Sequence, residues 1–170
     1  MMTNPLIRLL SLLTLGLFTN LALSAEPLTT GDKIAAALKD ERRSTAEVDR
    51  DRNRKPLETL KFFRLKDDMT VLEIMPGGGW YTNILGPVLA ERGRLLLTIG
   101  AERTAERLIG QPGFESTELI PFDRSNISRS TTSRAMIMPA FSLGVKKVDL
   151  ALTFRNLHNL SPESRQHMNK

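Results

Sequence analysis

Three consecutive glycines, Gly77, Gly78 and Gly79, form the stretch of the sequence that is best suited to bind a ligand. Glycine has no Cβ, so such a turn can adopt positive φ and lets a ligand approach the main chain closely. The apolar residues 71–75 before it predict a buried parallel strand that is interrupted by one acid, Glu73. A helical pattern follows, and the order strand, glycine turn, helix presents main-chain N–H groups to a ligand. The alternative is that the glycines only allow a helix to pack close to the strand.

The spacing of these glycines distinguishes between two kinds of cofactor site. Thr82 stands where the dinucleotide motif G-x-G-x-x-G requires its third glycine, which weakens an NAD-dependent oxidoreductase as an interpretation. The segment around Glu73 and the glycines instead resembles motif I of the class I S-adenosylmethionine (SAM)-dependent methyltransferases, with Met75 in place of the motif's first glycine. The fuller string Glu-x-x-Pro-Gly-Gly-Gly-Trp-Tyr-Thr, with Arg-Asn-Leu-His at residues 155–158, is similar to an exported branch of predicted bacterial methyltransferases. The similarity extends over residues 32–158.

The resemblance implies a cofactor and a reaction. SAM would be bound by Glu73, Gly77, Gly78 and Gly79, and its methyl group would pass to an acceptor that the sequence does not identify. Because this transfer is a direct displacement from a sulfonium, positioning matters more than acid–base chemistry. The alternative is an exported, non-catalytic protein that binds a small molecule and retains the methyltransferase fold. The replacement of a motif glycine by Met75 favours that alternative.

Three residues further along the chain are additional candidates for the site. Glu102 is the only acid near the end of the second predicted strand, where doubly wound folds hold ribose hydroxyls, but it also suits the first turn of a helix. Asp123 follows the third predicted strand, where the resemblance implies an adenine contact; it could equally be a turn residue. His158 follows the fourth predicted strand and is the candidate catalytic residue, as a general base or substrate orienter. Its alternative role is a hydrogen bond to a main-chain carbonyl.

A charged segment precedes the first predicted strand. Residues 44–55 contain almost no large apolar side chains, which indicates either a solvated loop or a segment that covers the substrate or cofactor. Arg43, Asp51 and Arg54 resemble an Arg…Asp-x-x-Arg pattern of the same methyltransferase branch. Arginines there could clamp a carboxylate or a phosphate through two parallel hydrogen bonds.

The remaining pattern predicts the elements that position these residues. Apolar runs predict strands at residues 70–75, 94–99, 116–122 and 148–154. Helical periodicity predicts helices over residues 32–42, from Pro56 onward, and over residues 81–91 and 104–109, with Pro87 kinking the third or displacing its start. We therefore expect a doubly wound, mostly parallel α/β sheet with a Rossmann-like methyltransferase fold. Relative to the seven-stranded sheet of that class, the domain is expected to be C-terminally truncated after the fourth strand.

The N-terminus predicts export. Residues 1–25 combine one basic residue, a 15-residue apolar run and the small residues Ser24 and Ala25, which is the layout of a signal peptide. The run is shorter than the ~20 residues of a membrane-spanning helix, although an uncleaved anchor is the alternative. We expect a periplasmic protein that contacts the membrane only through this segment. Residues 26–170 would then form a single α/β domain.

Composition narrows the range of partners. The chain of 170 residues has a net charge of +5 with mixed signs, one Trp and one Tyr, which does not favour nucleic acid as a partner. Two histidines and no cysteine make a structural zinc site an unfavourable interpretation. The expected partners are a small-molecule cofactor and an unknown acceptor. A homodimer is also expected, because the fourth strand would be an open edge.

Overall fold

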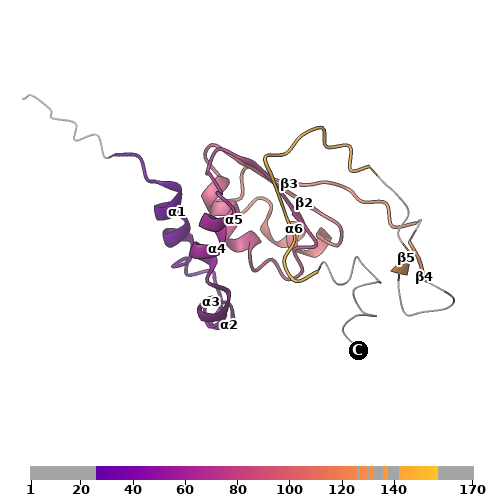
Figure 1. The fold of residues 1–170 in the computed structure, drawn as a ribbon, viewed down its shortest axis with the longest axis horizontal. Helices are drawn as coiled ribbons and strands as arrows, with labels where there is room; N and C mark the ends of the chain where they lie inside the picture. The colour runs from indigo at the N-terminus through magenta and orange to yellow at the C-terminus, as the bar shows by residue number, and fades with distance from the viewer. Residues whose placement is uncertain (1–25, 126, 130, 132–135, 138–141, 157–170) are drawn as a thin grey trace, which may run out of the picture.

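The computed structural model describes residues 26–125, 127–129, 131, 136–137 and 142–156, and it contains a four-stranded parallel sheet (Figure 1). The strand order is β3-β2-β1-β6, with parallel pairing between all neighbours. The strands are β1 (Thr70–Ile74), β2 (Arg94–Thr98), β3 (Thr117–Leu119) and β6 (Leu150–Leu152). The predicted α/β class with a parallel sheet is thereby confirmed.

The two central strands are the most fully buried part of the sheet. Val71 pairs with Leu95 and Glu73 pairs with Leu97, and all four residues are buried. Leu96 alternates to the opposite face of the sheet and is buried as well, as expected for an apolar run in a parallel strand. The outer strands are shorter than the sequence predicts: among the described residues β3 and β6 each pair with one strand, over three residues.

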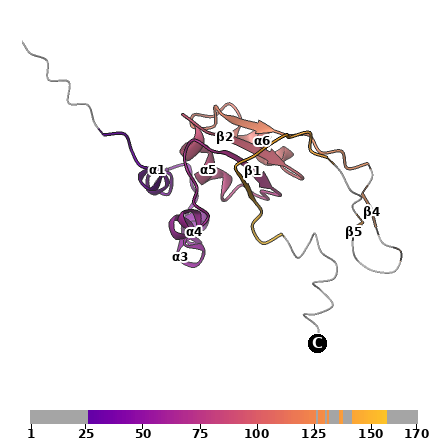
Figure 2. The same cartoon turned by 45° about the horizontal axis from the view of Figure 1, so that its top comes forward.

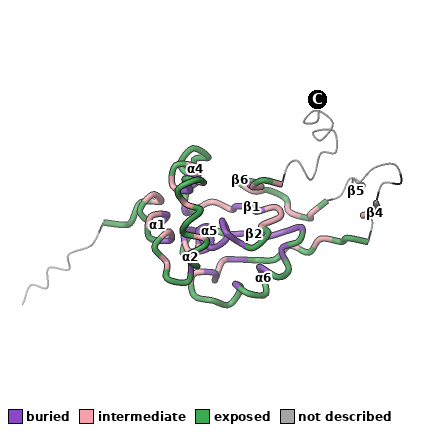
Figure 3. The backbone as a smooth tube through the Cα atoms, turned by 90° about the horizontal axis from the view of Figure 1, so that it is seen from below, coloured by how far each residue is buried: buried purple, intermediate pink, exposed green. Residues whose placement is uncertain are grey.

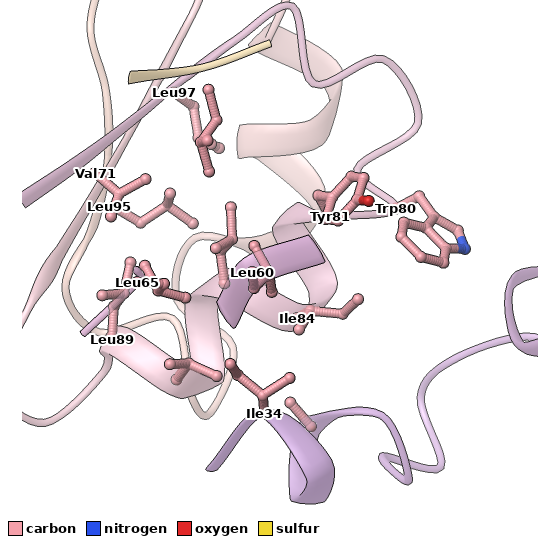
Figure 4. Packing of buried hydrophobic residues seen from close by; sticks show 14 of the residues in the cluster. Ile34, Leu60, Leu65, Val71, Trp80, Tyr81, Ile84, Leu89, Leu95 and Leu97 are labelled. Atoms are coloured by element: carbon pink, nitrogen blue, oxygen red, sulfur yellow. The ribbon is translucent and has the colours of Figure 1, made fainter. Parts of the chain in front are cut away.

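Helices pack against one face of the sheet and enclose the apolar core. The connections β1 to β2 and β2 to β3 contain α5 (Thr82–Leu89) and α6 (Glu102–Leu108). Against α5 pack α1 (Thr30–Ala37) and, next to it, α4 (Pro56–Phe62). Figure 4 shows side chains from these helices meeting the sheet; the labelled ones include Ile34, Leu60, Ile84, Leu89, Val71, Leu95 and Leu97. Helix α5 continues through Pro87 and begins one residue later than predicted.

A buried acid fixes α1 to the start of β1. Asp67 accepts hydrogen bonds from the Oγ1 of Thr30 at 3.1 Å and from Arg92 at 2.5 Å, and it forms an ion pair with Lys33 at 2.9 Å. Helix α1 begins earlier than predicted because Thr29 and Asp32 form a capping box, which satisfies the first N–H groups of the helix.

The charged segment before β1 is helical and is not a loop, although most of its residues are exposed, as the solvated alternative expected. It forms α2 (Thr45–Val48) and α3 (Asp51–Arg54). Ser44 and Glu47 form a capping box at the start of α2. The guanidinium of the buried Arg43 holds both carboxylate oxygens of Asp51, at 2.8 and 2.7 Å, so that α3 is joined to the chain before α2.

A small hairpin, which the sequence did not predict, lies away from the main sheet. Strand β4 (Ser128–Arg129) pairs antiparallel with β5 (Met136–Ile137). Figures 1 and 2 both show this pair at a distance from β1, β2 and the helices.

Strand β6 is the edge of the sheet within the part of the chain that the structure describes, where its one neighbour is β1. Figure 3 shows it beside β1, and its residues Leu150, Ala151 and Leu152 are half-buried, exposed and buried in turn. No helix among the described residues combines the length and the apolar character needed to cross a membrane.

Candidate functional site

A cleft of about 640 Å³ lies at the carboxyl ends of β1 and β6. The residues after β1 form its floor, α2 and α3 form one wall, and the residues after β6 form another. Its lining consists of Ser44, Ala46, Glu47, Arg50, Arg54, Glu73, Met75, Pro76, Gly77, Gly78, Trp80, Tyr81, Arg107, Phe154, Arg155 and Asn156. The chain runs from β1 to β2 on one side and returns to β6 on the other, so the cleft lies where the strand order reverses. Open parallel sheets bind their ligands at this place.

The glycine turn contributes two of its three glycines to the cleft. A Cβ added to Gly77 or Gly78 would meet no other atom within 4 Å, so both positions face open space. Within the described residues, no acceptor receives a hydrogen bond from the N–H group of either glycine. Their carbonyl groups are held from the other side, by the Oγ1 of Thr104 at 2.7 Å and by Arg107 at 3.0 Å. The turn therefore keeps two main-chain donors available to a ligand.

Gly79 has a different role from its two neighbours. It does not line the cleft, and its φ is +80°. A Cβ at this position would lie 2.8 Å from both Thr104 and Arg107 on α6. The interpretation that glycine only permits close packing of a helix therefore describes Gly79, and it does not describe Gly77 or Gly78.

Met75 stands where the resemblance to motif I places a glycine, and its backbone has a conformation that favours glycine. Its φ is +57°, in the left-handed region that costs a residue with a Cβ about 1–2 kcal/mol. The Met75 N–H donates to the carbonyl of Thr98 at 3.1 Å, and the Met75 carbonyl accepts from the side chain of Asn156 at 2.9 Å. These two bonds hold the strained residue in place.

Glu73 is buried beneath the glycine turn, with 2% of the residue exposed. The Oγ1 of Thr82, the first residue of α5, donates a hydrogen bond of 2.7 Å to its carboxyl group. Burial raises the pKa of Glu73 to about 7, and the bond from Thr82 only partly opposes this. Glu73 is therefore an acid that changes protonation near neutral pH at the inner end of the cleft.

Arginines give the cleft most of its charge. Arg50, Arg54, Arg107 and Arg155 line it, against the carboxyl groups of Glu47 and Glu73. The guanidinium of Arg54 lies 4.4 Å from the centre of the Trp80 ring, which is a cation–π contact. Burial lowers the pKa of Arg54, and the positive charges of Arg50 and Arg155 lower it further. The sequence pattern identified Arg54 as a clamp, whereas Arg43 and Asp51 pair with one another and lie outside the cleft.

Aromatic side chains complete the walls. The rings of Tyr81 and Phe154 stack with centroids 3.4 Å apart, and Trp80 packs edge-on against Tyr81. The indole N–H of Trp80 donates to the carbonyl of Glu47 at 2.9 Å, which attaches α2 to the glycine turn. The carboxylate of Glu47 also accepts from the side chain of Asn83 at 2.6 Å. The wall formed by α2 is thus fixed by residues that follow β1.

Sequence reasoning did not identify Arg50, Arg107 and Phe154 as site residues. Arg50 could have been found from its spacing, because it lies four residues before Arg54 in a helical segment and therefore on the same face. Arg107 and Phe154 carry no comparable signal, since their place in the cleft depends on α6 and on the pairing of β6 with β1.

Two predicted site residues lie elsewhere, and one cannot be placed. Glu102 is the exposed first residue of α6, and it does not line the cleft. Asp123 is exposed and accepts hydrogen bonds from the main-chain N–H and the Oγ of Ser125, at 2.8 and 2.9 Å, as a turn residue does. His158 lies outside the described residues.

The arrangement can bind a polar ligand through main-chain donors, cations and aromatic faces. Among the residues that the structure describes, no group of three or more metal-ligating side chains is positioned to hold a metal ion. Comparison of the chain with protein-family models, with curated proteins and with solved structures gave no match. The geometry of the cleft and the motif at its floor are therefore the grounds on which its function is inferred.

Proposed function

We propose that the cleft binds SAM and that the protein is a methyltransferase-like enzyme with a Rossmann-like, doubly wound fold. The observation that carries this proposal is the pair of N–H groups at Gly77 and Gly78, which have no acceptor among the described residues and lie at the reversal of strand order. The resemblance of residues 73–82 to motif I supports it.

The residues present fit this cofactor. The volume of about 640 Å³ lies within the range of small-molecule sites. The open space at Gly77 and Gly78 accommodates a ligand against the main chain, and the aromatic rings of Trp80, Tyr81 and Phe154 offer apolar faces. When bound, SAM supplies a methyl group that is activated on a sulfonium. The chain's own part is to orient cofactor and acceptor and to exclude water between them. His158 would accept a proton if the acceptor carries one.

The second candidate is a non-catalytic protein that binds a small molecule in the same cleft. The placement of Glu102 and Asp123 outside the cleft favours it, because the two acids expected to recognise the nucleoside do not line the site. For either candidate we propose export to the periplasm through residues 1–25.

Gly78 and Gly79 provide a matched pair of variants for the test. A Cβ at Gly78 meets no other atom within 4 Å, so Gly78→Val should fold normally and block the ligand. Gly79→Ala introduces a contact at 2.8 Å and a strained φ, so it should lower the melting temperature. Isothermal titration of the full chain with SAM, with its demethylated product and with NAD then measures binding.

We expect SAM and its product to bind the wild type and to lose at least tenfold in affinity for Gly78→Val, whose melting temperature is unchanged. Equal SAM affinity of Gly78→Val and wild type would mean that the ligand does not bind at this turn. Binding of the demethylated product alone, without methyl transfer to any acceptor in an extract, would favour the non-catalytic candidate.

A further inference from the structure

We infer that a pocket beside the glycine turn binds a phosphate monoester, and that this group belongs to the methyl acceptor. The pocket is lined by Arg50, Asn53, Arg54 and Arg155, has a volume of about 410 Å³ and shares its three arginines with the main cleft. We call it the arginine pocket. The assignment of this phosphate to the methyl acceptor rests on the proposed function, whereas the binding of an anion to the pocket does not depend on it.

The three guanidinium groups of the arginine pocket have no carboxylate counter-charge within the part of the chain that the structure describes. Among the described residues, no carboxylate forms an ion pair with Arg50, Arg54 or Arg155. Four other arginines have such partners; the pairs are Arg42 with Asp40, Arg43 with Asp51, Arg92 with Asp67 and Arg94 with Glu118. Exposed arginines such as Arg52 and Arg103 also have no ion pair among the described residues, so the distinguishing feature is that three unpaired arginines line one pocket. Converged cations without a counter-charge repel one another, and a bound anion would remove that cost.

The pocket is assembled from two distant parts of the chain. Arg50 and Arg54 come from α3 and the residue before it, whereas Arg155 follows β6, about a hundred residues later. Arg54 is held over the ring of Trp80, and its carbonyl accepts a hydrogen bond of 2.9 Å from Thr59. Arg155 has a φ of +59°, a conformation that costs energy at a residue with a Cβ. The fold thus holds the guanidinium of Arg54 in place. It also keeps Arg155 in a strained conformation at a position that lines the same pocket.

Charge distinguishes the acceptor from SAM as the source of the anion. SAM carries one carboxylate together with an ammonium and a sulfonium, so its net charge is positive. The cleft already contains four arginines against two glutamates, one of which is Glu73, so a cationic cofactor would by itself increase the repulsion. A phosphate monoester brings nearly two negative charges and three acceptor oxygens, which match planar guanidinium donors. Such a group neutralises the pocket and places the rest of the acceptor beside the glycine turn.

Inorganic phosphate is the direct probe of the arginine pocket. Titration of the full chain with phosphate, at fixed ionic strength set with sodium chloride, should show saturable binding. Arg155→Gln, at an exposed position, should weaken it about tenfold, and Arg54→Gln should do the same. Arg103→Gln, an exposed arginine of α6 that does not line the cleft, is the matched control and should leave the affinity unchanged. Melting temperatures identify any variant that loses binding by unfolding; because Arg54 packs on Trp80, Arg155→Gln is the deciding variant.

Competition with SAM separates this inference from the proposed function. Phosphate and SAM binding together supports both. Phosphate binding without SAM binding supports the anion site and contradicts the cofactor proposal. Displacement of phosphate by SAM would overturn the inference, because the arginines would then hold the cofactor's carboxylate. SAM binding with no phosphate binding, or equal phosphate affinity for wild type and Arg155→Gln, would overturn it as well.

The phosphate group can belong to a soluble ester or to a lipid headgroup. Sedimentation with vesicles of phosphatidic acid, compared with vesicles of phosphatidylcholine alone, distinguishes the two. Retention on phosphatidic acid that Arg155→Gln abolishes assigns the site to a lipid phosphate. Phosphate binding without retention on vesicles assigns it to a soluble phosphate ester.

Discussion

Asn156 donates from its side-chain nitrogen to the main-chain oxygen of Met75 at 2.9 Å, and this bond joins the ends of β6 and β1. The two residues are 81 positions apart in the sequence and border the cleft from opposite sides. The same nitrogen donates to the carbonyl of Phe154 at 3.1 Å, so one side chain fixes the turn after β6 and the turn after β1 together. The relative position of these two strand ends determines the shape of the floor of the cleft.

Removing this link should loosen the cleft. Asn156→Ala leaves the carbonyl of Met75 without this donor, and we expect it to lower the free energy of unfolding by about 1 kcal/mol. Ligand affinity should fall as well, because the two walls are no longer held together. Urea denaturation and titration with SAM measure the two effects; unchanged values for both would show that β6 is positioned by sheet pairing alone.

Met75 should be replaceable by the glycine that its backbone favours. Met75→Gly relieves a left-handed φ, and we expect a gain of about 1 kcal/mol in the free energy of unfolding, reduced by the lost contacts of the half-buried side chain. Met69→Gly, at a methionine with ordinary φ that packs on the core, is the matched control and should destabilise the protein. A loss of stability in both variants would mean that packing by Met75 outweighs the strain.

Glu73 should make stability depend on pH. Its pKa rises from 4.5 to about 7 on folding, so the folded state favours the protonated acid. The stabilisation is fully present below pH 4.5 and is lost as the pH rises through 7; over this window it amounts to about 3 kcal/mol. Glu73→Gln keeps an acceptor for Thr82 and carries no charge. It should therefore remove this decline and be more stable than the wild type at pH 8. Parallel stability curves of the two proteins between pH 5 and 8 would contradict the burial of an ionisable carboxyl group.

Asp67 should also make stability depend on pH, but in the opposite direction to Glu73: its contribution is lost as the pH falls. The guanidinium of Arg92, with Lys33, holds its pKa well below the usual range. Its contribution is therefore present above the unfolded pKa of about 3.9 and is lost as the pH falls further. Asp67→Asn should cost about 1–3 kcal/mol at pH 7, because Arg92, Lys33 and Thr30 lose a charged acceptor that is itself buried. The exposed neighbour provides the control, since Asp68→Asn should change the free energy of unfolding by less than about 0.5 kcal/mol. Similar free energies of unfolding for Asp67→Asn and Asp68→Asn would mean that the bonds of Asp67 to Arg92, Lys33 and Thr30 contribute little to stability.

The open side of β6 should promote self-association, which is how a homodimer could form. Within the described residues, the outer side of β6 has no partner strand. Phe62 on α4 is 80% exposed and packs on Phe63, which in turn packs on Phe154 just after β6, so an exposed apolar side chain lies near this edge. Light scattering over a range of concentrations should show association. Ala151→Lys, a charge on the edge strand, should reduce it, whereas Glu106→Lys on α6 should not. A monodisperse monomer at every concentration would show that this edge is protected.

The elements that the sequence predicted are those whose stability is local or depends on burial. Leu95, Leu96 and Leu97 predict a strand because residues on both faces of a central parallel strand are buried. The position of the glycine turn was predictable as well, because the turn directly follows β1, which is also a buried central strand. Helices α2 and α3 were not predicted because they have no apolar periodicity. They are stabilised by the capping pair Ser44 and Glu47, a signal present in the sequence, and by contacts with Trp80, which only the fold reveals.

The arginines show the limit of sequence reasoning for the site. A charged segment has the same pattern whether it faces solvent or a cleft. Arg54 and Arg155 line the same pocket because β6 pairs with β1, and no local sequence pattern predicts a pairing between segments so far apart in the chain. The separation of Gly79 from Gly77 and Gly78 likewise required the position of α6.

The pairing of β6 with β1 also has a kinetic consequence. The two strands are joined by bonds such as that from the N–H of Thr70 to the carboxylate of Asp149, which lies 79 residues later. Closing a loop of this length costs roughly 4 kcal/mol of chain entropy, whereas α1, α5 and the first three strands form from nearer neighbours. During synthesis the glycine turn is complete long before Phe154, Arg155 and Asn156 leave the ribosome. We therefore expect the cleft to assemble late in folding, and the amide protons of residues 150–152 should exchange with solvent faster than those of β1 and β2.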